Sequence, residues 1–385
     1  MFYIFLSFMI LYCIFVIYCK IRFRFWSIQP VFHLHNLVYW FAPCGIIQHA
    51  KPPFTKFFDP KIQCRPFSTI STTKKELFFS LNQKHYLQDK ETKFCPQKKN
   101  ISNYFQHHNR PCFISLYEKP KILFNYQKQY MVPQQECIAS ITARPLNVVL
   151  HGKKLNIYYI DYLCVKKGHR KKGIAPKLIY SFYVLLRGKK KTPEDKMVYL
   201  FKREGAATFI TPLTVYDSYG FYKRDWKIDN TIKEPILISK NSFDIFLHFM
   251  KQITFPCTII PSFSHIKHLI NEKEIFIFIL IIDNTECACY IFRDPHTIYN
   301  NKGFSIDLIA SYCKKGFETQ FIEGFYHCVA IMDFKYLLIE NLSHNNIILK
   351  SLTQKETPFF KSPTSYYFYN FAYRPFLSNN VFIIN

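Results

Sequence analysis

Residues 160–179, "IDYLCVKKGHRKKGIAPKLI", place a dense basic segment between two apolar runs. Residues 155–165 are apolar on both faces, which is typical of an interior strand. Pro176 suits the first turn of a helix, and an apolar stripe at helical spacing follows it. The sequence therefore predicts a strand, a basic loop over residues 166–173 and a helix from about Ala175.

The basic loop carries the pattern R-x-x-G-x-A, which begins at Arg170. Gly173 would let the backbone approach a phosphate closely, and the N–H groups at the start of the helix would point at the anion. Arg170 and Lys171 would neutralise its charge. A solvated surface turn would also be basic, but the strand–loop–helix frame favours a phosphate cradle. The pattern resembles the pyrophosphate loop of GNAT-type N-acyltransferases, which bind acetyl-CoA.

The composition indicates the class of protein. The chain has 385 residues, a formal net charge of +25 and 49% hydrophobic residues, so we expect a folded protein with an anionic partner and room for two domains. Enrichment in Phe, Tyr and Lys is also typical of an AT-rich genome, which would account for part of the charge. The 13 Cys show no disulfide framework and favour free thiols in a reducing compartment. Neither the CxC at 287–289 nor the HxH at 33–35 has partners at zinc spacing, so we expect no metal site.

Residues 1–19 carry no charge and approach the length that a membrane span needs. Lys20, Arg22 and Arg24 follow, which is consistent with a cytoplasmic C-terminal side. The absence of a small-residue cleavage site disfavours a cleaved signal peptide. Two interpretations stay open for this segment: a signal anchor, and translated leader sequence upstream of the true start.

Periodicity and turn residues give a coarse map of the rest of the chain. A helix is predicted over 73–88, and residues 90–135 read as polar and irregular. The further predictions are strands at 137–150 (broken by Pro145), 275–282 and 333–340, and helices at 241–253, 305–315 and 345–353.

Three stretches resemble one family. Residues 160–176 are similar to the segment I-N-F-L-C-V-H-K-K-L-R-S-K-R-V-A-P of eukaryotic N-myristoyltransferases. Residues 25–31, FWSIQPV, resemble that family's F-W-x-T-Q-P-V, and residues 366–371, YYFYNF, resemble its Y-Y-L-Y-N-W. The matches occur in the family's order and span nearly the whole chain. The sequence is therefore identified as a divergent member of the N-myristoyltransferase, or glycylpeptide N-tetradecanoyltransferase, family.

The resemblance implies a mixed α/β (α+β) fold of two tandem GNAT-like acyl-CoA N-acyltransferase domains with pseudo-twofold symmetry. We expect an apolar segment at 1–19, an acyl-CoA-binding half at 20–230 and a C-terminal half at 231–385, with the boundary in the polar stretch 229–235. The resemblance also implies that myristoyl-CoA is a co-substrate and that no cofactor is permanently bound. It implies a monomer in the cytoplasm, which would be membrane-associated if residues 1–19 are an anchor.

The family's contacts with acyl-CoA map onto twelve positions of this sequence. Two of them, Tyr162 and Leu163, would also form the oxyanion hole through their backbone N–H groups, so Tyr is acceptable at 162 where the family has Phe. The resemblance implies that acyl-CoA is contacted by Arg24, Phe25, Trp26, Tyr162, Leu163, Cys164, Val165, Arg170, Lys171, Gly173, Ile174 and Ala175.

The resemblance also implies a mechanism. The nucleophile in this family is the N-terminal glycine amine of the protein substrate, which attacks the thioester directly, so no acyl-enzyme is implied. The base is the C-terminal carboxylate of the enzyme, which here would belong to Asn385. Because Val381–Ile384 are apolar, a buried tail would desolvate that carboxylate and raise its pKa. A frayed, functionless terminus is the alternative.

The motifs that contact the peptide in the family differ here. The nearest counterparts of Y-T-A-G and Y-W-H-R-x-L-N are residues 198–200 and 221–226, where Lys223 replaces the His, and Asp89 and Glu91 remain of an acidic cluster. Three alternatives therefore stay open: a GNAT-type N-acyltransferase with another acyl group or acceptor, a basic protein that binds nucleic acid or a membrane surface, and a relative that has lost catalysis. We expect no nucleic-acid partner, because no recognised nucleic-acid module is present.

Overall fold

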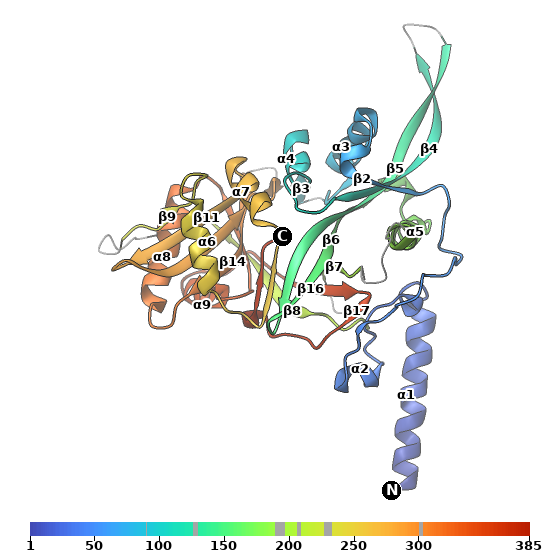
Figure 1. The fold of residues 1–385 in the computed structure, drawn as a ribbon, viewed down its shortest axis with the longest axis horizontal. Helices are drawn as coiled ribbons and strands as arrows, with labels where there is room; N and C mark the ends of the chain where they lie inside the picture. The colour runs from blue at the N-terminus through green and yellow to red at the C-terminus, as the bar shows by residue number, and fades with distance from the viewer. Residues whose placement is uncertain (90, 126–129, 189–196, 206–208, 227–232, 300–302) are drawn as a thin grey trace.

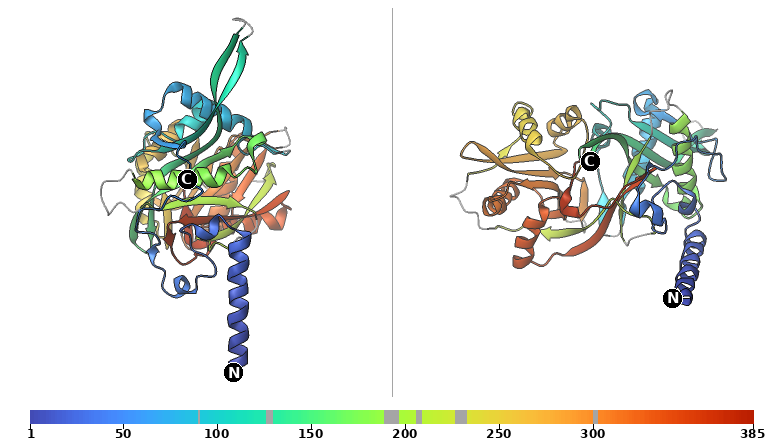
Figure 2. Two further views of the ribbon diagram at one scale, coloured as in Figure 1. Left: turned by 90° about the vertical axis from the view of Figure 1, so that its right-hand side faces the viewer. Right: turned by 60° about the horizontal axis from the view of Figure 1, so that its bottom comes forward.

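The computed structural model describes residues 1–385 except 90, 126–129, 189–196, 206–208, 227–232 and 300–302. A long mixed sheet runs through the body of the molecule, and helices pack against it (Figure 1). Helix α1 (Phe2–Arg22) projects away from the body in every view, next to the short α2 (Leu37–Phe41) (Figures 1 and 2).

The N-terminal half of the sheet is built around two long strands. Helices α3 (Thr72–His85) and α5 (Ile174–Gly188) pack on them, and α4 (Lys98–Asn103) follows α3 in the chain. The strands of this half are β2 (Gln63–Pro66), β3 (Thr92–Phe94), β4 (Phe113–Asn125), β5 (Tyr130–Leu150), β6 (Lys153–Val165) and β7 (Tyr199–Glu204).

The C-terminal half repeats this design with shorter strands. Its helices are α6 (Phe243–Gln252), α7 (Phe263–Asn271), α8 (Glu318–Ile331) and α9 (Asn345–Lys355). Its strands are β9 (Ile236–Leu237), β10 (Cys257–Ile260), β11 (Ile275–Ile282), β12 (Thr285–Arg293), β13 (Thr297–Tyr299), β14 (Gly303–Cys313) and β15 (Tyr336–Glu340).

Strands from distant parts of the chain join the two halves. Strand β16 (Phe360–Tyr369) lies between β7 and β8 (Thr214–Tyr222), and β8 pairs in turn with β15. Strand β17 (Phe371–Ala372) pairs with β1 (Gly45–Ile46), and β18 (Val381–Ile383) pairs with β10. The main sheet therefore runs in the order β18-β10-β5-β6-β7-β16-β8-β15-β14-β12-β11-β9.

Each half contains the same strand–helix–strand unit. In the N-terminal half β6 and β7 are parallel and α5 connects them; in the C-terminal half β14 and β15 are parallel and α8 connects them. The tandem arrangement of two α/β units, expected from the resemblance, is confirmed. The predicted domain boundary at 230/231 lies outside the described residues.

The strand, basic loop and helix predicted from residues 155–179 are confirmed as β6, a loop and α5. The apolar stripe explains why this helix forms where it does: Leu178 and Phe182 are fully buried, and Leu185 packs against the same core cluster. The predicted helices at 73–88, 241–253 and 345–353 correspond to α3, α6 and α9, and the predicted strands at 275–282 and 333–340 correspond to β11 and β15.

Three local predictions were wrong. Residues 305–315 are not a helix but most of β14, because residues 305–311 are buried without a break between two strands and show no strand alternation. Residues 90–135 are not irregular, since they contain β3, α4 and β4. Pro145 does not break β5. It lies between Ala143, the last residue of β5 that pairs with β4, and Asn147, the first that pairs with β10, so no strand on that edge needs its missing N–H.

Candidate active site

The basic loop joins β6 to α5 through a short 3-10 turn at Lys167–His169. Lys171 and Gly173 both have left-handed backbones, with φ of +62° and +71°. A Cβ on Gly173 would meet nothing within 4 Å, so glycine is favoured by its conformation and not by lack of space. The first turn of α5 contains no acidic residue, and its N–H groups are therefore suited to bind an anion.

A cavity of about 700 Å³ lies against this loop, and we call it the loop cavity. Its walls come from the end of β6, the start of α5 and the segment after α3. The structure therefore places the predicted residues at the end of β6 and those of the basic loop around the same cavity. The predicted acyl-CoA contacts that line it are Leu163, Cys164, Val165, Arg170, Lys171, Gly173, Ile174 and Ala175.

Arg170 also makes a contact that was not predicted. Its Nε donates to the carbonyl oxygen of Val165 at 3.1 Å, and its Nη2 donates to that of His85 at 2.7 Å. The side chain therefore fastens the loop to the end of α3 and fixes the shape of the loop. Lys171 is exposed at the loop cavity, and it remains the better placed of the two cations to meet a phosphate.

Cys164 lies in β6, two residues before the basic loop, and its side chain lines the loop cavity. Burial raises the pKa of this thiol to about 12. It is therefore neutral at physiological pH, and a neutral thiol is a poor nucleophile. The geometry does not favour a cysteine-bound acyl intermediate at this position.

Strand β6 carries a β-bulge at the two residues predicted to form the oxyanion hole. Its pairing with β5 shifts by one residue there, so Tyr162 and Leu163 together face Ile141. Tyr162 has a left-handed backbone with φ of +46°, and Leu163 is 37% exposed. A bulge takes backbone groups out of the regular ladder and can aim them elsewhere.

Asp161 holds one of the two predicted oxyanion donors. The N–H of Tyr162 donates to Asp161 Oδ1 at 2.8 Å, and the hydroxyl of Tyr86 donates to the same oxygen at 3.1 Å. Arg144 Nη2 donates to Oδ2 at 2.9 Å. Burial, followed by the charge of Asp161, raises the pKa of Tyr86 well above its ordinary value, so this hydroxyl stays protonated. The Tyr162 N–H can meet a thioester oxygen only after it leaves Asp161.

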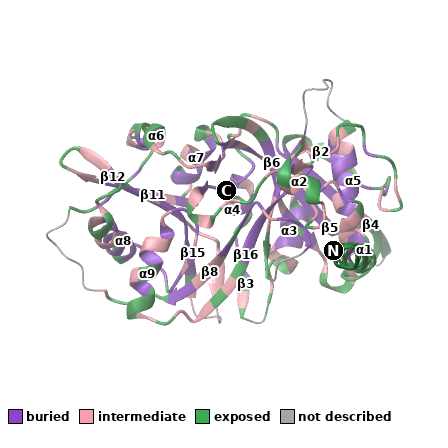
Figure 3. Ribbon diagram, turned by 90° about the horizontal axis from the view of Figure 1, so that it is seen from below, coloured by how far each residue is buried: buried purple, intermediate pink, exposed green. Residues whose placement is uncertain are grey.

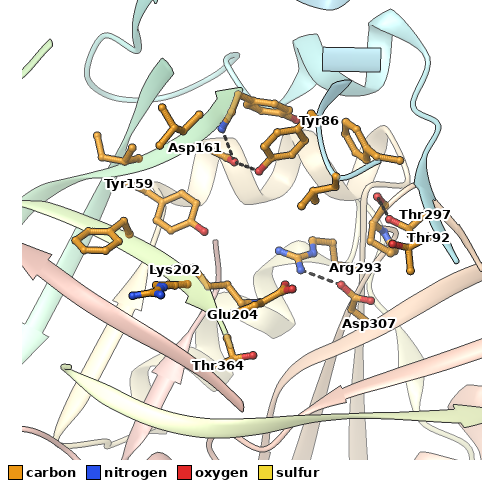
Figure 4. Close-up of a pocket in the computed structure, with 18 of the residues that line it drawn as sticks. Tyr86, Thr92, Tyr159, Asp161, Lys202, Glu204, Arg293, Thr297, Asp307 and Thr364 are labelled. Atoms are coloured by element: carbon orange, nitrogen blue, oxygen red, sulfur yellow. Dashed lines mark hydrogen bonds and ion pairs between the residues drawn. The ribbon is translucent and has the colours of Figure 1, made fainter. Parts of the chain in front are cut away.

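A second cavity of about 960 Å³, the central cavity, lies between the two halves (Figure 4). It begins where the loop cavity ends, at the bulge of β6. Side chains that project into it come from β5, β6 and β7 on one side and from β12, β14 and β15 on the other. The residues that line both cavities are Tyr86, Leu87, Asp89, Thr92, Leu163 and Glu204.

One part of the central cavity is apolar and contains the predicted Trp26. The indole stacks on Phe201 with ring centroids 5.6 Å apart, and Phe25 packs edge-on against Trp26 at 5.1 Å. Phe25 and Arg24 line neither cavity, so the structure brings only Trp26 of this predicted trio to the site. Its other apolar and aromatic walls are Ile160, Ile179, Phe182, Tyr183, Tyr199 and Tyr369.

The two outer motifs of the sequence meet behind this apolar wall. The hydroxyl of Tyr369 donates to Gln29 Oε1 at 2.6 Å, and the backbone N–H of Asn370 donates to the carbonyl oxygen of Pro30 at 2.6 Å. The Asn370 side chain also holds residues 48 and 197. These contacts fix the segment that carries Trp26 against β16, and they explain why the two motifs occur together.

The opposite part of the central cavity is polar and contains a buried ion network. Lys202 Nζ lies 2.7 Å from Glu340 Oε1, and Arg293 Nη2 lies 2.8 Å from Asp307 Oδ2 and 3.7 Å from Glu340 Oε1. Tyr216 donates to Glu340 Oε2 at 2.8 Å. Burial raises the pKa of Glu340, but Lys202 and Arg293 outweigh it and the net pKa is lowered. Burial raises the pKa of Asp307 despite the opposing Arg293.

Sequence reasoning missed this network. Lys202, Arg293 and Glu340 lie on three strands that are separated by long stretches of chain, so no local spacing indicates that they meet. The available signal was a difference from the family's motif. Y-T-A-G has no charged residue, whereas β7 continues from Tyr199 into Lys202 and Glu204. Both of these charged residues line the central cavity, as do the predicted Asp89 and Glu91.

The tail is buried, as predicted, and is not frayed. Val381–Ile384 are each at most 1% exposed, and the N–H of Ile384 donates to Ile259 at 2.9 Å. Asn385 is 5% exposed, and Arg293 Nη1 lies 3.5 Å from its backbone oxygen. The sequence predicted only desolvation of the carboxylate, whereas the structure also places the guanidinium of Arg293 nearby, which favours the charged form of a carboxylate. Asn385 as the base stays a prediction.

Comparisons with known proteins agree with this geometry. Residues 67–183 match the family model for Myristoyl-CoA:protein N-myristoyltransferase, N-terminal domain. A crystal structure of Saccharomyces cerevisiae N-myristoyltransferase with bound myristoyl-CoA superposes with a TM-score of 0.67 at 17% identity, over 92% of this chain and 94% of that chain. A structure with bound myristoyl-CoA and inhibitors gives 0.65 at 15% identity, over 93% and 92%. A comparison with curated protein sequences gives no match.

The matched family model covers the bulge and the basic loop, which are the elements that form the loop cavity. The solved structures share the fold over nearly the whole length of this chain, including the C-terminal half that the family model does not reach. At such low identity this likeness concerns the fold and not the substrate. Residues 67–183 therefore match the N-terminal domain of the N-myristoyltransferase family, and nearly the whole chain shares the fold of the solved N-myristoyltransferases.

Proposed function

We propose that this protein transfers a myristoyl group from myristoyl-CoA to the amine of an N-terminal glycine. The observation that carries the proposal is the meeting of the loop cavity and the central cavity at Leu163. An acyl-CoA laid across this junction would have its phosphates at the basic loop and its thioester at the bulge. Its acyl chain would enter the aromatic part of the central cavity, and the acceptor would approach through the polar part.

The basic loop would bind the pyrophosphate. The left-handed backbone at Lys171 and Gly173 turns the chain into α5, whose first N–H groups and positive dipole end favour an anion. Lys171 adds a charge-assisted hydrogen bond. Arg170 would act indirectly, as a positioning residue that holds the loop to α3.

The reaction would be a single direct transfer. The neutral glycine amine attacks the thioester carbon, the C–S bond breaks, and the CoA thiolate takes up the proton that the amide nitrogen loses. The N–H groups of Tyr162 and Leu163 would stabilise the oxyanion, which requires Tyr162 to exchange its bond to Asp161 for one to the thioester oxygen. The terminal carboxylate of Asn385 would take the proton from the incoming ammonium, since this amine is mostly protonated at neutral pH.

The test is myristoyl transfer by the full chain to a peptide that begins with glycine, followed as release of the CoA thiol. A peptide with an acetylated terminus is the control for attack by the amine. We expect a chain lengthened by one glycine after Asn385 to lose about 100-fold or more in kcat, because the carboxylate is displaced, while binding of myristoyl-CoA is unchanged. The matched variant Asn385→Ala keeps the terminal carboxylate and should retain turnover.

Other outcomes would redirect the proposal. Binding of myristoyl-CoA without transfer to any glycine peptide would indicate a relative that has lost catalysis. Transfer that is faster from a shorter acyl-CoA, or to a lysine side chain, would indicate another acyl or acceptor specificity. No binding of any acyl-CoA would overturn the interpretation of the basic loop.

A further inference from the structure

The proposed function leaves α1 without a role, although it is the most exposed apolar element that the structure describes. All residues from 2 to 15 are exposed (Figure 3), and an 18-residue window of the helix has a mean hydropathy of 2.4. Its 21 residues give a length of about 30 Å, which matches the hydrocarbon thickness of a bilayer. An apolar helix that docks on one protein surface shows one apolar stripe, whereas α1 is apolar on every side.

Helix α2 lies beside α1 and exposes a second apolar surface. The hydroxyl of Tyr12 donates to the carbonyl oxygen of His35 at 2.8 Å, just before α2 begins. Leu37, Val38 and Phe41 of α2 are 54%, 68% and 81% exposed. Tyr12 is ten residues from the end of α1, so this contact lies about 15 Å along the helix from the body. A bilayer that receives α1 therefore also meets α2.

Three hydrogen bonds to backbone carbonyl oxygens tie α2 and the residues just before it to the rest of the protein. Besides the bond from Tyr12, Trp40 Nε1 donates to the carbonyl oxygen of Leu34 at 3.1 Å, and Arg374 Nη2 donates to that of Phe41 at 3.0 Å. Backbone groups can leave water for lipid only when they are satisfied internally. Arg374, which contacts the last residue of α2, has a long side chain that can reach toward the headgroups.

Positive charge is placed where α1 returns to the body. Lys20, Arg22 and Arg24 are exposed there, and residues 1–19 contain no charge of either sign. Basic residues at the end of an apolar helix fit the headgroup layer and attract anionic lipids. The apolar part of α1 thus matches the hydrocarbon layer of a bilayer, and the basic residues that follow it match the headgroup layer.

We propose that α1 and α2 insert together into a lipid bilayer that contains anionic headgroups, with Lys20, Arg22 and Arg24 at its surface. Trp40 of α2 is then in contact with lipid. If the proposed function holds, Trp26 follows the membrane surface within a few residues, and the acyl part of the central cavity opens near the layer in which an acylated product would partition.

Trp40 makes the proposal testable in the full chain, which has only three Trp. Trp26→Phe with Trp226→Phe leaves Trp40 alone. Trp26→Phe with Trp40→Phe leaves Trp226, in the C-terminal half, as the matched control. Each protein is mixed with vesicles of phosphatidylcholine and phosphatidylserine whose acyl chains are brominated, so that quenching reports contact with the hydrocarbon. We expect Trp40 to lose most of its emission and Trp226 to keep it.

Three results would overturn the proposal. Vesicles that float without the protein would show that neither helix inserts. Flotation of the protein with an unquenched Trp40 would show that α1 inserts without α2. A mass that lacks the residues of α1 in the protein recovered from cells would show that the segment is a removed leader. Phe41→Ser should reduce the quenching of Trp40, whereas Ile331→Ser, at a comparably exposed apolar residue of α8, should not. None of these readouts involves acyl-CoA, so they are independent of the proposed function.

Discussion

The two strand–helix–strand units of the molecule are built alike but end in different junctions. Both contain a β-bulge in the strand that precedes the helix, between β5 and β6 in one half and between β12 and β14 in the other. The first bulge exposes Leu163 at the meeting point of two cavities, whereas Ile309, at the second, is 1% exposed and lies in the core. The same backbone device opens a site in one half and is sealed in the other.

The helix starts differ in the same way. The loop before α5 leaves the helix N-terminus without an acidic residue. The loop before α8 also contains a left-handed glycine, Gly316, with φ of +91°, but there the carboxylate of Glu318 accepts the N–H of Gly316 at 3.1 Å. The protein therefore supplies its own anion to the start of α8 and supplies no acidic residue to the first turn of α5. A strand–loop–helix frame is thus insufficient evidence for a phosphate site, and the first turn of the helix must also be free of acids.

Both halves do keep one buried ion pair next to the bulge. Arg144 with Asp161 and Arg293 with Asp307 are 2.9 and 2.8 Å apart, and the two arginines are at most one-fifth exposed. We expect Arg293→Met to lower the free energy of unfolding by about 3–5 kcal/mol, because it leaves the buried carboxylate of Asp307 without its partner. Arg144→Met should cost less, because the carboxylate of Asp161 is partly exposed and still accepts from Tyr86 and Tyr162. Urea unfolding followed by circular dichroism would measure this.

The exposed pair Lys361–Asp217, 3.0 Å apart, supplies the control. Lys361→Met should lower the free energy of unfolding much less than either variant of a central pair, because exposed ion pairs contribute little to stability. A loss at Arg293 that is no larger than the loss at Lys361 would contradict the interpretation of the central network as a buried one.

The second prediction concerns the two left-handed glycines. Gly173→Ala and Gly316→Ala should each be strained by about 1–2 kcal/mol, since neither site lacks space for a Cβ but both have positive φ. If the proposed function holds, only Gly173→Ala should weaken the binding of myristoyl-CoA, by about tenfold, because only this loop would contact the ligand. Isothermal titration with myristoyl-CoA would separate the two variants, and equal affinities would break the contrast between the junctions.

The third prediction concerns the contact between the halves at His296. Its Nε2 lies 2.6 Å from Glu274, which also accepts from Asn100 and Asn103 of α4. Burial lowers the pKa of His296, but the hydrogen bond to Glu274 and the charge of Asp294 outweigh it, so the pKa is raised above 6.5. The stabilisation is thus complete below pH 6.5 and is lost as pH rises through the higher folded-state pKa.

Unfolding measured across that pH range should therefore show a decline in stability that Glu274→Gln reduces. Glu274→Gln keeps a side chain of the same size, so the change in slope, rather than any general loss of stability, is the diagnostic result. A slope that stays the same in Glu274→Gln would mean that another group is responsible.

The smallest effect is expected at Glu318. Its hydrogen bonds to its own N–H and to that of Gly316 lower its pKa, so its stabilising contribution is present above the unfolded pKa and is lost as pH falls. Glu318→Gln should slightly lower the melting temperature at neutral pH and leave it unchanged at acidic pH. A binding site for CoA that appears in this variant would show that Glu318 had been blocking a second cradle.

The parts of the site that rest on backbone geometry could be predicted from the sequence. A left-handed glycine, a helix start and an interior strand each have a local signature, so Gly173, Pro176 and residues 155–165 predicted the strand, the loop and the helix start that line the loop cavity. Resemblance added Trp26 and the motif at 366–371, which the structure joins through Gln29 and Tyr369.

The polar part of the central cavity could not be predicted in this way. Lys202, Arg293 and Glu340 meet only because β7, β12 and β15 converge, and pairwise contacts between distant strands leave no periodic trace in the sequence. The prediction of a helix in place of β14 was wrong for a related reason. A strand buried on both faces has neither the alternation of a half-exposed strand nor a helical stripe. The hydrogen bond from the Tyr162 N–H to Asp161 forms where Tyr162 has a positive φ, and a positive φ at a residue other than glycine cannot be predicted from the sequence.

The contact between Gln29 and Tyr369 has a consequence for how the protein is made. These residues are 340 positions apart, so the segment that carries Trp26 leaves the ribosome long before its partner strand β16 exists. During that interval its aromatic residues have no complete core to enter and are open to chaperones or to aggregation. Closing such a distant pair late also makes folding slow. Fragments that lack β16 are therefore poor tools for studying this protein, because the wall that holds Trp26 is incomplete without that strand.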